Sequence, residues 1–586
     1  MICRCKARKW HKAAVWLRCR KRTRGNAREF FLYKKGEINV RKLSAVLLSC
    51  TMAFGVLAAG CSTNDTAAPG NQDAGQAKQE QKAKILMYNN QEEPTSLDPP
   101  IGFDERSYDI LTNLMEGLTR LGKNQEPEPA MAKEWKVSED KKKYTFTLRD
   151  GVKWSNGEPV TAQDFEYAWK RMLDPKTAPP SPAAFLAYVI EGAEAFNSGK
   201  GKAEDVKVKA INEKTLEVTL AKPASYFLNM VANPALFPVH KKTVESNKNW
   251  AAESSTYVSN GPFKMSEWKH NDEIKMIKNE SYWDAANVKL DGVTWKMIDD
   301  LGTEYQMYQT GELHATTNVP PDLSDQLFAE NKAKVEDGAG TYFYRFNIKK
   351  EPFDNVNIRK AFNLALDRQK IVDLINKRKE KPATGFVSYG FKDPAGGDFR
   401  DVSGELLKFN AEEAKQLLQK GMQEKGYTKL PEITLVYNDS STHPKIAQAM
   451  QEMYKEVLDV EVKLITKEWK VLQDEQKRGE LMLSRSSFLP DFADPINFLE
   501  GFQTGNSMNR TGWGNAQYDK LIQDAYNEAD DAKRYQMMHE AEKILMNEAP
   551  IIPLYYYNKA YLQSDKVEGI VRHPFGYIDF KWADIK

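Results

Sequence analysis

Two short polar segments carry the side chains best suited to hold a small charged ligand. Arg485, Asp491 and Asp494 lie close together in one segment, and Asn438 and His443 bracket the other. A carboxylate, a guanidinium and an imidazole around one cleft can bind a zwitterion, with its ammonium on Asp491 and its carboxylate near Arg485 or His443. The spacing alone also fits surface charges or an internal ion pair, and it favours that simpler interpretation.

Both segments follow predicted strands in a region that alternates strand and helix patterns. Alternating apolar residues predict strands at 433–437, 460–464 and 481–483. Apolar residues at helical spacing predict helices at 414–422, 446–457 and around Trp469, the first of which ends at Gly426. This alternation predicts an α/β lobe with a largely parallel sheet. Ligands of such sheets bind beyond the carboxyl ends of the strands, which is where the polar segments lie.

Further elements are predicted nearer the N-terminus. Alternating apolar residues from Tyr144 to Leu148 predict a strand that ends at the turn Asp150-Gly151. Thr161 and Asp164 have the spacing of a capping box and open a predicted helix. Its apolar face carries Phe165, Ala168, Trp169 and Met172, and another helical stripe carries Ile358, Phe362 and Leu366.

The N-terminal region has the layout of a secretory signal. An uncharged apolar run, residues 43–59, follows Arg41 and Lys42 and is short for a membrane span. The small residues at its end lead directly to Cys61, and Leu57–Cys61 (LAAGC) resembles the lipobox of bacterial lipoproteins. The resemblance implies that Cys61 becomes the first mature residue and carries a diacylglyceryl thioether. The alternative is an N-terminal anchor that is not cleaved.

Cysteine usage and charge change at the same boundary. All five cysteines lie at or before Cys61, so the exported part has no disulfide framework and no cysteine nucleophile. Residues 1–60 hold 15 of the 84 Lys and Arg but only 2 of the 82 Asp and Glu, which leaves 69 basic and 80 acidic residues and a net charge of −11. An acidic body argues against nucleic acid as a partner. We expect translation to begin near Val40, because a basic arm before an export signal serves no evident purpose.

Several long motifs resemble one family in the same order along the chain. They are Ser96–Pro99 (SLDP), Leu148–Gly157 (LRDGVKWSNG), Pro159–Phe165 (PVTAQDF), Ser259–Lys264 (SNGPFK), Val356–Ala361 (VNIRKA) and Pro490–Pro495 (PDFADP). Together they resemble the peptide-binding proteins of ABC importers, in particular the oligopeptide-binding subgroup. The resemblance covers nearly all of residues 84–586.

The resemblance implies an α/β fold of the periplasmic-binding-protein type, with two lobes that close on a hinge and an extra inserted domain. We expect residues 1–60 to be a basic leader and signal peptide, and residues 61–83 to be a lipid-anchored flexible tether. The implied domains are a discontinuous first domain (84–115, 243–339 and 556–586), an inserted second domain (116–242) and a third domain (340–555).

The resemblance also implies roles for site residues. Asp491 matches the aspartate that receives the α-ammonium of a peptide, and we expect Asp494 to matter less for that ammonium. Ser487, Phe488 and Leu489 match a strand that pairs with the peptide backbone, and Phe103, Asp104 and Glu105 match the opposing strand. Arg485 and His443 match residues near the carboxyl end of longer peptides, and Trp469 and Phe488 match the walls of a side-chain pocket. Gln476 stands where some relatives have a second carboxylate-binding arginine.

The predicted protein is a lipid-anchored receptor on the outer face of the cell membrane, not an enzyme. It would bind short peptides, deliver them to the permease subunits of an ABC transporter, and act as a monomer without a cofactor. The chain lacks a nucleophile elbow, an H-E-x-x-H motif and a P-loop. Its histidines are scattered singly, which does not favour a metal site. The alternatives are an importer protein for dipeptides, nickel complexes or sugars, and a peptide-sensing or chaperone lipoprotein.

Overall fold

The computed structural model describes residues 5–8, 16–23, 26–32, 83–440 and 442–586, which belong to two compact units divided between Glu80 and Gln81. In the first unit, β1 (Cys5–Arg8), β2 (Trp16–Thr23) and β3 (Asn26–Leu32) form an antiparallel sheet where the sequence predicts only a basic leader. The signal peptide, its Cys61 and all but the last residue of the predicted tether lie outside the described residues. Within the described ranges, no helix has the length and apolarity needed to cross a membrane.

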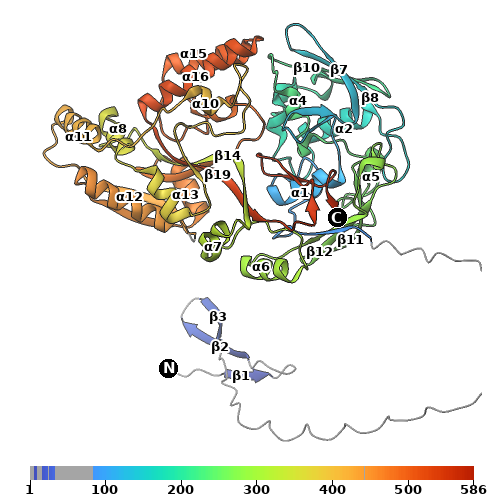
Figure 1. The fold of residues 1–586 in the computed structure, drawn as a ribbon, viewed down its shortest axis with the longest axis horizontal. Helices are drawn as coiled ribbons and strands as arrows, with labels where there is room; N and C mark the ends of the chain where they lie inside the picture. Colours follow the sequence, from blue (N-terminus) through green and yellow to red (C-terminus); the bar gives the residue numbers. More distant parts are fainter. Residues whose placement is uncertain (1–4, 9–15, 24–25, 33–82, 441) are drawn as a thin grey trace, which may run out of the picture. The chain divides into compact units, whose positions relative to one another are not determined.

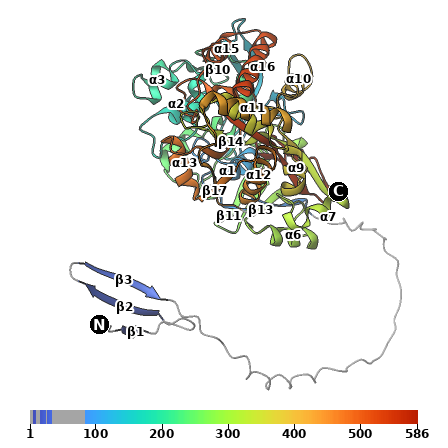
Figure 2. The same ribbon diagram turned by 90° about the vertical axis from the view of Figure 1, so that its left-hand side faces the viewer.

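The second unit contains two four-stranded sheets. We call these two sheets and the helices around them the first lobe. One sheet has the order β11 (Phe263–Lys269), β12 (Glu273–Lys278), β13 (Gly292–Lys296) and β4 (Ile85–Asn89), and only its last pair is parallel. In both views α6 (Leu301–Thr310) lies beside this sheet (Figures 1 and 2). The other sheet is antiparallel, in the order β7 (Ala132–Val137), β8 (Lys143–Leu148), β10 (Thr215–Thr219) and β9 (Val208–Asn212).

The second lobe is built on a six-stranded mixed sheet. Its order is β15 (Lys381–Pro382), β19 (Ile551–Leu562), β14 (Ala333–Phe346), β18 (Leu483–Phe488), β16 (Ile433–Asn438) and β17 (Val462–Lys467). Its main helices are α8 (Val356–Leu364), α11 (Ala411–Lys425), α12 (His443–Leu458), α13 (Trp469–Lys477), α15 (Ala516–Asn527) and α16 (Asp531–Glu548).

The prediction of a largely parallel sheet is wrong for half of this sheet. β16, β17 and β18 are parallel, as expected of strands joined through helices, but β14, β15 and β19 are antiparallel to their neighbours. β18 also begins at Leu483, two residues after the predicted start, so Arg485 lies within the strand and not beyond its end.

Two long strands, β14 and β19, connect the lobes. At one end Ala560 and Leu562 of β19 pack against Val319 and Leu327 of the first lobe, and at the other end β14 lies within the sheet of the second lobe. Figure 1 shows both strands running through the middle of this unit, between the helices of the two lobes. The pairing of β14 with β19 is interrupted between Asp337 and Thr341, which gives the ribbon a point at which it can bend.

Local signals in the sequence fix several elements as predicted. Thr161 caps α2 (Ala162–Leu173) with a reciprocal capping box, and the predicted apolar face of α2 is buried. Gly426 ends α11 in the left-handed conformation, with a φ of 68°. α8 ends before the predicted stripe does, although Leu366 is still buried.

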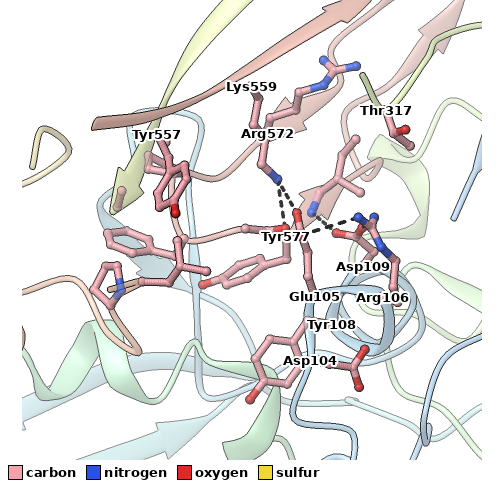
Figure 3. A pocket seen from close by; sticks show the side chains of 18 of the residues that line it. Asp104, Glu105, Arg106, Tyr108, Asp109, Thr317, Tyr557, Lys559, Arg572 and Tyr577 are labelled. Atoms are coloured by element: carbon pink, nitrogen blue, oxygen red, sulfur yellow. Dashed lines mark hydrogen bonds and ion pairs between the residues drawn. The ribbon is translucent and has the colours of Figure 1, made fainter. Parts of the chain in front are cut away.

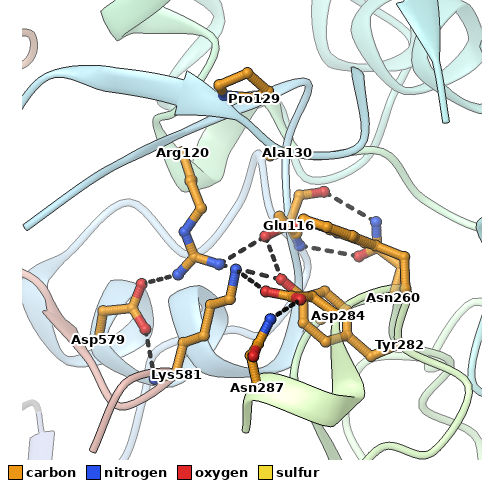
Figure 4. A network of polar contacts seen from close by, with 12 residues as sticks. Glu116, Arg120, Pro129, Ala130, Asn260, Tyr282, Asp284, Asn287, Asp579 and Lys581 are labelled. Carbon is orange, nitrogen blue, oxygen red and sulfur yellow. Dashed lines mark hydrogen bonds and ion pairs between the residues drawn. The ribbon is translucent and has the colours of Figure 1, made fainter. Parts of the chain in front are cut away.

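The C-terminal segment packs against the first lobe through buried polar contacts. Arg120 pairs with Glu116 at 2.7 Å and with Asp579, and Lys581 pairs with Asp284 at 2.9 Å (Figure 4). The pairs Arg120–Asp579 and Lys581–Asp284 join segments that lie hundreds of residues apart in the sequence.

The two ends of this unit also meet in the first lobe. Lys84 Nζ lies 2.6 Å from a carboxylate oxygen of Asp584. The exact boundaries of the three domains stay a prediction.

Candidate functional site

A pocket of about 570 Å³ lies where the lobes and the connecting strands meet (Figure 3). The start of α1 (Glu105–Leu114) contributes one wall, and β18 with the loop that follows it contributes another. The connecting strands add Gly338 and Tyr557–Lys559, and the C-terminal segment adds Arg572 and residues 574–578. The pocket therefore draws on parts of the chain that are distant in sequence.

Asp491 is held in place by its backbone, and its carboxylate is left available. Its N–H donates to Asn497 Oδ1 at 2.7 Å, and its carbonyl oxygen accepts from Asn233 Nδ2 at 3.1 Å. Burial, with a contribution from the nearby Glu500 carboxylate, raises the pKa of Asp491 to about 7. Among the described residues, no cation lies within ion-pair distance of this carboxylate. A cationic ligand group would favour its charged form.

The part of β18 nearest to Asp491 has one edge that is not paired with another strand. β14 pairs with β18 from Leu483 to Phe488, but β16 pairs only with Leu483 and Ser484. The carbonyl of Arg485, on the side facing away from β14, accepts from Gln476 Nε2 at 2.9 Å. Since alternate residues of a strand direct their backbone polar groups to the same edge, Ser487 directs its groups away from β14, and Leu489 follows directly after the strand. An extended chain could pair with this edge.

Arg485 lies in the pocket without a carboxylate partner among the described residues. Its Nη1 is 3.4 Å from Asn438 Oδ1, and its guanidinium lies over the rings of Tyr342 and Trp469, at 4.8 and 5.6 Å from their centroids. Its positive charge is thus held by amide, hydroxyl and aromatic groups. A ligand carboxylate would be its first anionic partner.

His443 lies beside Arg485 but does not supply a second positive charge. Burial, reinforced by the Arg485 cation, lowers the pKa of His443 to about 4. The imidazole is therefore neutral at pH 7, and its Nδ1 donates to the carbonyl of Asn438 at 3.1 Å. Of the two partners considered for a ligand carboxylate, Arg485 is the charged one.

The residues expected on the opposing side, 103–105, already contact other groups of the protein. Asp104 caps α1, because its Oδ1 accepts from the Ser107 N–H at 2.9 Å. Burial alone would raise the pKa of Glu105, but the cations of Lys559, at 2.9 Å, and Arg106 outweigh it and lower that pKa. Phe103 packs edge-to-face on the ring of Tyr108.

The pocket brings together seven of the eleven ligand residues expected from the sequence: Phe103, Asp104, Glu105, Arg485, Ser487, Leu489 and Asp491. Asn438, His443 and Trp469 surround Arg485 from outside the pocket lining. Phe488 does not line the pocket, because alternate residues of a strand point to opposite faces and its ring packs on Phe386 and Phe498.

Sequence reasoning missed several lining residues, notably Tyr108, Asn233, Lys559 and Arg572. None of them lies in a motif, and they reach the pocket only through long-range packing. The return of the C-terminal segment to the first lobe, which the resemblance implies, is the one signal that could have pointed to Lys559 and Arg572. In the part of the chain that the structure describes, no group of three or more His, Cys, Asp or Glu could hold a metal ion.

Comparison with known proteins agrees with this architecture. The sequence model of the bacterial extracellular solute-binding proteins, family 5 Middle, matches residues 126–510. The dipeptide-binding protein DppE of Bacillus subtilis is 56% identical over 93% of this chain and 99% of its own length. The oligopeptide-binding protein OppA of the same organism is 42% identical over 87% of this chain and 95% of its own length.

Solved structures show the same fold. The murein tripeptide-binding protein MppA, in its unliganded open form, has a TM-score of 0.74 at 32% identity and covers 86% of this chain and 98% of its own. OppA of Listeria monocytogenes bound to peptide has a TM-score of 0.70 at 32% identity, with 86% and 99% covered. The predicted fold class, an α/β periplasmic-binding-protein fold with two lobes and an inserted domain, is confirmed. The chain belongs to the bacterial extracellular solute-binding proteins, family 5.

Proposed function

We propose that this protein is an extracytoplasmic receptor that binds short peptides between its two lobes and delivers them to an ABC transporter. The observation that carries the proposal is the Asp491 carboxylate, which has no cationic partner among the described residues and lies beyond an open strand edge, in a pocket that also contains Arg485. A peptide has the matching groups: an ammonium, a backbone that can extend a sheet, and a carboxylate. Its relatives are named for dipeptide and oligopeptide binding.

This arrangement supports affinity without strong dependence on ligand sequence. Pairing with Ser487 and Leu489 uses only backbone N–H and C=O groups, which all peptides have. Asp491 would set the register by fixing the amino end. Closure of the lobes about the β14–β19 ribbon would enclose the peptide and produce the shape that a transporter recognises.

We expect the purified protein to bind unmodified peptides and to release them intact. Calorimetry with alanine peptides of two to six residues should reveal the preferred length, and mass spectrometry of the recovered ligand should show no cleavage. A protein that binds none of these peptides would contradict the receptor proposal. Hydrolysis that persists after contaminating proteases are removed would contradict the proposal that it is not an enzyme.

We further propose that the receptor is a monomer held at the membrane by a lipid on Cys61. The support is the signal layout that ends in Leu57–Cys61. Acyl chains contribute about 0.8 kcal/mol per buried CH₂ to membrane binding.

We therefore expect Cys61→Ser to block lipidation and to move the protein from the membrane fraction to the medium or to soluble fractions. Cell fractionation and metabolic labelling with a fatty acid measure the two effects separately. A Cys61→Ser protein that is still processed and still sediments with membranes would show that another element anchors the chain.

A further inference from the structure

Arg572 is a buried cation whose charge has no anionic partner among the described residues. Arg572 is only 8% exposed, and its Nη1 donates to the neutral Gln563 Oε1 at 3.0 Å. Its guanidinium lies over the ring of Tyr561, 3.5 Å from the centroid. Nη2 is buried and has no hydrogen-bond partner in the part of the chain that the structure describes. A buried guanidinium that retains a free donor is suited to receive an acceptor from a ligand.

Arg572 is a lining residue of the pocket that also contains Asp491. Its partner Gln563 forms a β-bridge with Ala315, which is two residues before the lining residue Thr317. Figure 3 shows Arg572 and Thr317 among the labelled residues of this pocket. Burial raises the pKa of Tyr88 to about 12 although the Arg572 cation opposes the shift, so the Tyr88 hydroxyl also lies within reach of this charge.

The other lining charges are already compensated, with two exceptions. Lys559 pairs with Glu105 at 2.9 Å, and Arg106 lies 3.6 Å from Asp109. The Asp104 carboxylate caps α1. Among the described lining residues, Asp491 and Arg485 also lack a charged partner, and so does Asp104, whose carboxylate is held by the N-terminus of α1.

A simple zwitterionic peptide would neutralise two of the three groups Asp491, Arg485 and Arg572. Its ammonium would pair with Asp491 and its terminal carboxylate with Arg485, which leaves Arg572 enclosed and unpaired when the lobes close. An enclosed charge without a counter-ion is costly, and a second ligand anion removes that cost. The pocket is complementary to a ligand with one cation and two anions.

We infer that Arg572 forms a subsite for an acidic side chain of the bound peptide, and that the protein prefers peptides with one glutamate or aspartate at the position facing it. This inference rests on the proposed function and adds a ligand class to it. The charge of Arg572 would act through its free Nη2, which can donate to a carboxylate in a charge-assisted hydrogen bond.

The test is a calorimetric comparison of alanine peptides in which each position in turn carries either glutamate or its neutral isostere glutamine. We expect one position at which the glutamate peptide binds at least about tenfold more tightly than the glutamine peptide, the size of one charge-assisted contact. In Arg572→Gln this ratio should fall to about twofold or less. Arg572→Lys keeps the charge and should retain part of the preference, which protects the test against a packing defect at Tyr561.

Arg478→Gln is the matched control, because it removes an exposed arginine that pairs with Glu480 outside the pocket. It should leave the preference for glutamate unchanged. If peptides bind but glutamate and glutamine are equivalent at every position, the subsite inference is wrong while the receptor proposal stands. If no peptide binds, the receptor proposal fails and the subsite with it. A preference that survives unchanged in Arg572→Gln would assign it to another residue.

Discussion

Asp491→Asn is expected to weaken peptide binding by about 3–5 kcal/mol, which is two or more powers of ten in Kd. The substitution removes the charge that would face the peptide ammonium and leaves that ammonium enclosed without a counter-ion. The thermal stability of the free protein should not fall, since the Asp491 carboxylate has no cationic partner among the described residues and its burial already opposes its charge. Calorimetry and thermal unfolding of the same preparation measure the two effects.

N-acetylation of the peptide provides the second half of a double-mutant cycle. It should cost the natural protein a comparable loss of affinity and cost the Asp491→Asn variant little more, because both changes delete one interaction. Equal binding of free and acetylated peptides by the natural protein would rule out an ammonium site at Asp491.

The raised pKa of Asp491 predicts how peptide affinity and stability depend on pH. Because this pKa is about 7 in the free protein, the carboxyl is increasingly protonated below pH 7, while a peptide ammonium stays charged up to about pH 8. Peptide affinity should therefore fall as the pH is lowered from 7 to about 5, and Asp491→Asn should lose this dependence. For stability the sign is opposite: a carboxyl whose pKa is raised by folding lowers the free energy of unfolding as the pH rises from about 4 to 7.

Unlike Asp491→Asn, the substitution Asp494→Asn should mainly reduce stability, with a loss of about 3–5 kcal/mol in the free energy of unfolding. Both oxygens of Asp494 accept from Arg534, at 2.8 and 2.5 Å, and both side chains are almost fully buried. Burial alone would lower the pKa of Arg534, but the Asp494 carboxylate outweighs it and raises that pKa. Removing one partner leaves a buried charge uncompensated. Urea unfolding measures the loss.

The double variant Asp494→Leu/Arg534→Met tests this cause, since it removes both charges and should unfold less readily than Asp494→Asn. The ammonium site should persist in Asp494→Asn, so acetylation should still weaken binding at a temperature where the variant is folded. Unchanged stability of Asp494→Asn would show that the ion pair contributes little.

The contrast between Asp491 and Asp494 marks what a sequence can predict. The motif Pro490–Pro495 points to a charged site, and the resemblance distinguishes the two aspartates by role. It does not reveal that Asp494 is engaged by Arg534, forty positions further on, because that pair depends on how α16 packs. As a control for Asp491, Asp494 is therefore unsuitable when stability is the readout.

The same limit applies to the fold. Capping residues such as Thr161 and Gly426 act through neighbours in sequence, so they predict the limits of α2 and α11 well. The antiparallel half of the central sheet could not be predicted in this way, because β14 and β19 pair across about two hundred residues of chain. Arg572 could not be predicted from the sequence for a similar reason. Only the folded chain shows that its charge has no anionic partner among the described residues.

The contact between Lys84 and Asp584 has a practical consequence for engineering. Because the side chains of these residues are in contact, with Lys84 Nζ 2.6 Å from Asp584 Oδ1, a short glycine-rich linker could join the segments that contain them, and the chain could be reopened at an exposed turn elsewhere. A turn in the second lobe, such as the one at Gly426, would make the new ends travel with the lobe that carries Asp491. Fluorophores placed at the new ends and in the first lobe would then convert ligand capture into an optical signal.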